Sequence, residues 1–176
     1  MSKTAIFSVF SIILFFIVVS CFFTMNERQQ GLVLQFGEPK RVIKESGLHF
    51  KIPLIQNVVR YDRRILEYNL PVEEVIAVDK KRMLVDSFAR FQITDPLEFY
   101  KTVGNEVNVR NRLNSNVISS LRRVVGRVTL DELLSAERSN IMDRIKIEVN
   151  DEAKRFGIEV VDVRIRRADL PEANSQ

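Results

Sequence analysis

The stretch Met83-Leu-Val-Asp-Ser-Phe-Ala-Arg-Phe-Gln-Ile93 alternates in polarity, and Asp95-Pro96 follows it closely. An alternation with a period of two predicts a β-strand, the longest in this chain. One face is apolar and the other is mixed, so the second face is expected to be only partly covered. The apolar face consists of Met83, Val85, Ala89, Phe91 and Ile93, and the mixed face of Leu84, Asp86, Phe88, Arg90 and Gln92. Asp95 as N-cap and Pro96 at the first helical position predict a turn from strand to helix.

Helical periodicity dominates the chain beyond this strand. Apolar residues recur at intervals of three and four over about 106–125 and again over about 135–156, which predicts two long helices. Between them, Thr129-Leu-Asp-Glu132 has the form of a capping box. Alternation returns over 158–167, which predicts a last strand with Val161, Val163 and Ile165 inward. That strand must pair with an earlier one that is distant in sequence.

The region before residue 83 predicts further short strands, at about 32–36, 47–53, 58–61 and 65–70. In the second of them, Leu48, Phe50 and Ile52 share one face, and His49 and Lys51 share the other. His49 is therefore expected to face solvent or to be hydrogen-bonded. Strands come first, then helices, then one returning strand, which predicts an α+β fold with a twisted, mainly antiparallel sheet and packed helices over 26–170.

The N-terminal segment Ala5–Phe23 carries no charge over 19 residues. As a helix with a rise of about 1.5 Å per residue it would span roughly 28 Å, close to the hydrocarbon core of a bilayer. This predicts a single transmembrane helix within residues 1–25, with the rest of the chain on one side. The residues expected to anchor it are Ala5, Ile6, Phe10, Ile13, Leu14, Phe16, Val19 and Phe23.

Two other interpretations of this segment stay open. A cleaved signal peptide usually has a shorter apolar region and an A-x-A-like site, which is absent here. Val18-Val19-Ser20-Cys21 loosely resembles a lipoprotein cleavage box, so lipidation of Cys21 is an alternative. Flanking charges do not decide the orientation, because Lys3 precedes the helix while Arg28, Lys40 and Arg41 follow it.

The composition offers little for catalysis. The chain has one His and one Cys, which excludes an intrachain disulfide and a zinc site built from these residue types. Nucleotide-binding glycine loops are missing, and adjacent acidic pairs such as Asp131-Glu132 are typical of solvated surface. The net charge of +4 reflects 27 basic and 23 acidic residues without the clustering that nucleic-acid binding requires. We therefore expect a non-enzymatic protein without cofactor, metal or nucleic acid.

Several segments, in order, resemble one known family. They are Gly31-Leu-Val-Leu-Gln-Phe-Gly37, Ser46 to Ile55, Tyr61-Asp-Arg-Arg-Ile65, Leu84-Val-Asp-Ser-Phe88, Leu121 to Gly126, Thr129 to Arg138, Gly157 to Ile165 and Ala168-Asp-Leu-Pro171. Together they resemble the SPFH (band 7) family, which comprises stomatins, prohibitins, flotillins and the bacterial HflK/HflC branch. The amino-acid sequence of these segments is most similar to that of the HflK/HflC branch. The residues that carry the motifs are Gly31, Phe36, Gly37, Gly47, His49, Pro53, Asp62, Arg64, Asp86, Arg122, Gly126, Leu130, Arg138, Gly157, Asp162, Arg164 and Pro171.

The resemblance implies a single-pass protein of the bacterial inner membrane with its bulk in the periplasm. It also implies a hetero-oligomer with an HflK-like subunit that regulates the ATP-dependent membrane protease FtsH, and contact with lipids. Family members continue into a long charged helix where residues 171–176 stand, so truncation before that helix is expected and assembly is in doubt. A stomatin-like membrane organiser with other partners or lipids is the alternative function, and a peptidase is a third.

Overall fold

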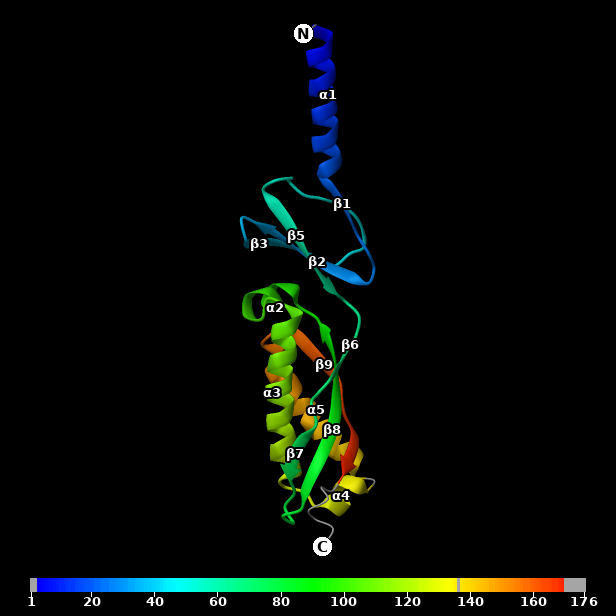
Figure 1. The fold of residues 1–176 in the computed structure, drawn as a ribbon, viewed down its shortest axis with the longest axis vertical. Helices are drawn as coiled ribbons and strands as arrows, with labels where there is room; N and C mark the ends of the chain where they lie inside the picture. The colour runs from blue at the N-terminus through cyan, green and yellow to red at the C-terminus, as the bar shows by residue number, and fades with distance from the viewer. Residues whose placement is uncertain (1–2, 136, 170–176) are drawn as a thin grey trace. The chain divides into compact units, whose positions relative to one another are not determined.

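A computed structural model describes residues 3–135 and 137–169 (Figure 1). The chain divides into two compact units, which we call the first unit (Met1–Arg63) and the second unit (Arg64–Gln176). Both combine strands with helices, and every strand pair is antiparallel. The α+β class is therefore confirmed, but the strands form separate sheets in place of the one twisted sheet predicted above.

The first unit contains one helix and two small sheets. Its elements are α1 (Lys3–Ser20), β1 (Phe22–Met25), β2 (Gln29–Gln35), β3 (Glu38–Ile43), β4 (Gly47–Phe50) and β5 (Gln56–Asp62). Strands β1 and β4 pair with each other, and β3-β2-β5 form a three-stranded sheet. A small core joins the two sheets, and its members are Phe23, Met25, Val33 and Ile43 with Val58 packed against them.

Helix α1 ends at Ser20, three residues before the predicted end of the apolar segment. Phe22 and Phe23 belong to β1, so the assignment of Phe23 to the anchoring helix is wrong. The reason is tertiary, because Phe23 pairs with His49 of β4 and is buried in the core of the first unit. Within the described residues, no helix combines the length and apolar content needed to cross a membrane.

Strand β3 was not predicted, because Pro39 lies near its start. Among the described strands β3 pairs with β2 alone, so Pro39 lies on an edge strand, where proline is tolerated in a sheet. A register shift between Val33 and Leu34 accommodates it. In β2, Gly31 lies so close to β1 that an added Cβ would stand 2.4 Å from the terminal methyl of Met25.

The second unit is built around its longest strand. Its elements are β6 (Leu66–Asn69), β7 (Glu73–Ile76), β8 (Arg82–Ile93), α2 (Pro96–Thr102), α3 (Glu106–Val125), α4 (Leu130–Leu134), α5 (Arg138–Lys154) and β9 (Ile158–Asp169). Strand β9 pairs with β8 over nearly its whole length, while β6 and β7 pair with successive parts of the opposite edge. The predicted long-range pairing of the last strand is confirmed.

Burial in the second unit follows the predicted faces closely. All five apolar-face residues of β8 are almost fully buried, and so is the stripe of α3 that comprises Val109, Leu113, Val117, Leu121, Val124 and Val125. Val161 is the exception on β9, where Val160 is buried in its place. A register shift pairs Arg90 with Asp162 and Phe91 with Val160, so Val161 is the extra residue of a β-bulge.

The predicted helix starts of the second unit are largely confirmed. Asp95 Oδ1 accepts hydrogen bonds from the backbone N–H of Leu97 at 2.9 Å and of Glu98 at 3.2 Å. Thr129 and Glu132 form the expected capping box. The last long helix begins at Arg138, later than the predicted residue 135, because α4 forms a separate short helix before it.

Candidate interaction surface

Exposed apolar side chains gather on the first unit where α1 meets the sheets. Leu54 is fully exposed, with a relative exposure of 104%, and Phe36 reaches 81%. Their two turns are joined by a hydrogen bond from the Phe36 N–H to the Ile55 carbonyl oxygen. The described side chains of α1 are also exposed, so helix and turns present one apolar surface, which we call the apolar surface of the first unit.

The short strand β4 contributes to this surface with inverted polarity. Leu48 and Phe50 are 66% and 52% exposed, whereas His49 between them is half-buried. The His49 ring packs 5.8 Å from the Phe23 ring, and its Nε2 lies 2.9 Å from the Glu45 carbonyl oxygen. His49 is therefore hydrogen-bonded, one of the two outcomes predicted for it. A strand with its polar residue inward and its apolar residues outward is suited to an apolar surrounding.

Both exposed turns hold a large apolar residue in a left-handed backbone conformation. Phe36 has a φ of 52° and Leu54 a φ of 69°. Residues with a Cβ cost roughly 1–2 kcal/mol in this region, where glycine is the usual residue. Neither the backbone nor burial within this chain accounts for a Phe and a Leu at these two places, which points to an external contact.

A groove of about 920 Å³ lies between the last turns of α1 and the segment 50–57. Apolar side chains of Ile13, Phe16 and Ile17 form the helix side, and those of Phe50, Ile52 and Leu54 the opposite side. The polar lining residues are Ser20, Lys51, Gln56 and Asn57, of which Lys51 is the cationic one. The groove is therefore apolar along α1, and its cationic residue belongs to a backbone that meets the end of the helix.

The first unit also carries the net positive charge of the whole chain. It holds eight basic and four acidic residues, while the second unit holds nineteen of each. Lys40, Arg41, Lys51 and Arg60 have no acidic partner within ion-pair distance in the part of the chain that the structure describes. The second unit, by contrast, has ion pairs such as Arg122–Glu73 at 3.0 Å. A basic, apolar surface of this kind is suited to lipid membranes.

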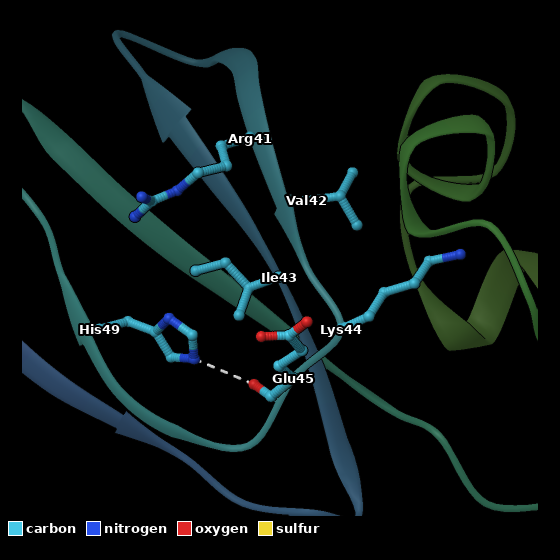
Figure 2. A pocket seen from close by; sticks show the side chains of 6 residues that line it. All are labelled: Arg41, Val42, Ile43, Lys44, Glu45 and His49. Carbon is cyan, nitrogen blue, oxygen red and sulfur yellow. Dashed lines mark hydrogen bonds between the residues drawn. The ribbon is translucent and has the colours of Figure 1, made fainter.

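A second hollow, of about 440 Å³, lies beside β3 and β4 (Figure 2). The guanidinium group of Arg41 and the ring of His49 face it across Ile43, while Lys44 extends away from the other residues. Arg41 donates a hydrogen bond to the Phe50 carbonyl oxygen at 2.7 Å. The His49 ring is bound to a backbone carbonyl oxygen, and in the described part of the chain no hydrogen bond joins it to a nucleophilic side chain.

The described residues contain no group of three or more His, Cys, Asp or Glu side chains placed to hold a metal ion.

The predicted motif residues are distributed over both units and do not converge on one site. Several shape the backbone: Gly37, Gly47 and Gly157 have positive φ angles, Gly126 ends α3, and Pro53 lines the groove. Others make ion pairs, hydrogen bonds or buried contacts within the second unit. Asp86 pairs with Arg166 at 3.8 Å, Arg164 with Asp162 at 3.1 Å, Arg138 donates to the Ile165 carbonyl oxygen, and Leu130 is buried. Asp62 and Arg64 are engaged in interactions, and Pro171 lies outside the described residues.

Of the predicted anchor residues, Phe10, Ile13, Leu14, Phe16 and Val19 lie on α1 with exposed side chains. Ala5 and Ile6 belong to the helix, but their side chains lie outside the described set. The sequence prediction missed the contribution of Phe36, Leu48, Phe50 and Leu54. A signal was present in the pairs Phe36-Gly37 and Pro53-Leu54, where bulky apolar residues stand beside turn residues.

Comparison with known proteins identifies the family to which this chain belongs. The model of the SPFH domain / Band 7 family matches residues 23–176, and the chain therefore belongs to this family. Within the family it is similar to HflC proteins. It is 32% identical to "Protein HflC" of Haemophilus influenzae over 167 residues, which cover 89% of this chain and 57% of that protein. It is 28% identical to "Modulator of FtsH protease HflC" of Escherichia coli over 213 residues, covering 93% and 64%.

A eukaryotic relative is almost as similar. The chain is 30% identical to "Stomatin-1" of Caenorhabditis elegans over 171 residues, which cover 97% of this chain and 49% of that protein. The chain thus spans about half to two thirds of the length of these relatives.

Proposed function

We propose that this protein is a non-enzymatic, membrane-attached scaffold that modulates a membrane protease of the FtsH type. The observation that carries the proposal is the apolar surface of the first unit, where α1, Phe36 and Leu54 expose side chains that the fold does not cover. The name of the Escherichia coli relative, a modulator of FtsH protease, supports the regulatory part.

Helix α1 is the proposed membrane anchor, inserted as a single pass. Its 18 residues correspond to about 27 Å at a rise of about 1.5 Å per residue. A helix slightly shorter than the hydrocarbon core can be accommodated by local thinning of the bilayer and by flanking groups at the interface. The exposed turns at Phe36 and Leu54 supply such groups, because apolar side chains next to cations are stable at the level of the headgroups.

Placement in the bacterial inner membrane, with the bulk of the chain in the periplasm, is part of the same proposal. It rests on the similarity to HflC proteins, since the flanking charges do not decide the direction. The proposed partners are an HflK-like subunit and an FtsH-type protease, in a hetero-oligomer. The second unit, with balanced charges and ion pairs at its surface, is the part of the chain proposed to make such contacts.

Co-purification from detergent-solubilised membranes tests the regulatory role. We expect an HflK-like subunit and an FtsH-type protease to be enriched with the tagged chain, and absence of both would refute the proposal. Purified protein free of FtsH should leave casein intact, whereas cleavage of casein would support the peptidase alternative.

A stomatin-like organiser remains the second candidate function, favoured by the 30% identity to Stomatin-1. Protease treatment of spheroplasts separates the two. Digestion of the chain from outside is expected for the HflC-like topology, and protection would favour the stomatin-like one.

A further inference from the structure

We propose that the groove between α1 and segment 50–57 binds one anionic phospholipid, with the phosphodiester at Lys51 and an acyl chain along α1. This inference rests on the proposed membrane attachment and adds to it a defined lipid site with a headgroup preference. The groove volume of about 920 Å³ lies within the range of roughly 300–1,000 Å³ that is typical of ligand sites.

The backbone fixes the position of Lys51. Its N–H donates a 2.8 Å hydrogen bond to the carbonyl oxygen of Cys21, directly after the last residue of α1. The Lys51 backbone therefore stands directly after the C-terminal end of the helix. The last turn of α1 itself contains no basic residue, so Lys51 is the cation among the residues that line the groove.

The Lys51 ammonium group is available to a ligand. It makes no ion pair or side-chain hydrogen bond with any described residue, although the side chain is half-buried in the groove wall. Asn57, which also lines the groove, is exposed and likewise has no described partner for its side-chain amide. A phosphodiester oxygen can accept hydrogen bonds from both an ammonium and an amide N–H.

Gln56 does not compete for the ligand, because its own amide holds the loop in shape. Its Oε1 accepts a hydrogen bond from the Ile52 N–H at 2.9 Å, and its Nε2 lies 3.5 Å from Oε1 of Gln35. Hydrogen bonds within the first unit therefore hold the loop that bears Lys51 and Leu54, which is one wall of the groove.

The distribution of polarity selects a phospholipid over an apolar helix of a second copy. Ile13, Phe16 and Ile17 line the helix side, while Lys51 and Asn57 line the opposite side, and the Lys51 backbone is hydrogen-bonded to Cys21 directly after the helix. A partner helix buried along the groove would leave the Lys51 charge unpaired in an apolar contact, which is strongly unfavourable. An amphiphile with an acyl chain and an anionic head matches both kinds of lining residue.

Native mass spectrometry of the full chain tests this site. The protein is reconstituted in nanodiscs that contain equal amounts of phosphatidylglycerol and phosphatidylcholine, and the lipids that remain bound after release are identified. We expect preferential retention of one phosphatidylglycerol. Lys51→Gln should lower the preference for phosphatidylglycerol about fivefold, the effect of one cation near a membrane surface. Because the Lys51 backbone N–H persists in this variant, the loop should keep its fold.

Lys40→Gln is the matched control, since Lys40 is an exposed, unpaired cation of the first unit outside the groove. It should retain the wild-type preference. Equal loss in both variants would show that only general charge matters and would overturn the site, as would unchanged retention in Lys51→Gln. A lipid-free dimer in place of the bound lipid would also overturn it, in favour of a second copy.

Flotation with liposomes separates this inference from the proposed function. If the wild-type chain floats but Lys51→Gln keeps its lipid preference, the groove proposal fails and the membrane anchor stands. If the wild-type chain does not float at all, the proposed membrane attachment itself is wrong.

Discussion

Replacing Leu54 by Trp converts the exposed turn into a reporter of its surroundings. The chain contains no Trp, so this residue would be the single indole fluorophore. Leu54 touches water over its whole side chain, and moving a Leu side chain from water into an apolar phase is worth about 1.5–3 kcal/mol. Phe36, on the neighbouring turn, adds about 2 kcal/mol on the same scale, because it is not quite fully exposed.

The assay is quenching of Leu54→Trp by brominated phosphatidylcholine in liposomes. We expect strong quenching and a blue-shifted emission relative to liposomes without bromine. Adding Phe36→Ser removes about 2 kcal/mol of the interfacial anchoring, which lowers the equilibrium for turn insertion by roughly 30-fold. Quenching should fall accordingly.

Val107→Trp provides the control, because Val107 is an exposed apolar residue on α3 of the second unit. Its fluorescence should remain that of an indole in water. If Leu54→Trp is quenched no more than Val107→Trp, the turn does not meet the lipid, and the argument from exposed apolar residues in strained turns fails.

Three further substitutions, one of them with a matched control, test the fold by thermal or chemical unfolding. Phe23→Ala should destabilise the first unit by about 3–5 kcal/mol, because Phe23 fills its core, whereas Phe22→Ala should cost far less. Arg138→Ala should cost about 1–3 kcal/mol, since it leaves the Ile165 carbonyl of β9 without its guanidinium donor. Gly157→Ala should prevent stable folding of the second unit, because the new Cβ would lie 2.3 Å from the Asp95 carbonyl oxygen at a φ of 69°.

Each of these outcomes has a result that contradicts it. Equal losses for Phe23→Ala and Phe22→Ala would show that Phe23 is not a core residue. An Arg138→Lys variant as stable as wild type would show that charge near β9 suffices without the guanidinium. A well-folded Gly157→Ala protein would show that the close contact at Asp95 is not maintained.

The second unit was predictable because its signals are local. The bounds of α3 follow from Asn105 and Gly126, which cap it, and from an apolar stripe that recurs without interruption. The alternation of apolar and polar residues along β8 predicts which side chains lie on each of its two faces. The bulge at Val161 could not be predicted, since two consecutive Val residues fit either register and only pairing with β8 decides between them.

The first unit was harder to predict because its strands are short and its surface is inverted. Phe22 and Phe23 continue the apolar run of α1, so only pairing with β4 shows where the helix ends. Alternation in β4 identifies two faces but not which one is buried, and here the face with His49 turns inward. The division after Arg63 has no Gly or Pro to mark it.

The joint between α1 and β1 has a mechanical consequence. Cys21 is the single residue between the two elements. Its N–H donates to the Ile17 and Val18 carbonyl oxygens, each at 3.2 Å, and its own carbonyl oxygen accepts a hydrogen bond from the Lys51 N–H. Hydrogen bonds on both sides of Cys21 restrain its backbone and limit swivelling of α1 on β1. If α1 is held in a bilayer as proposed, its tilt would be passed on to the β1–β4 ladder.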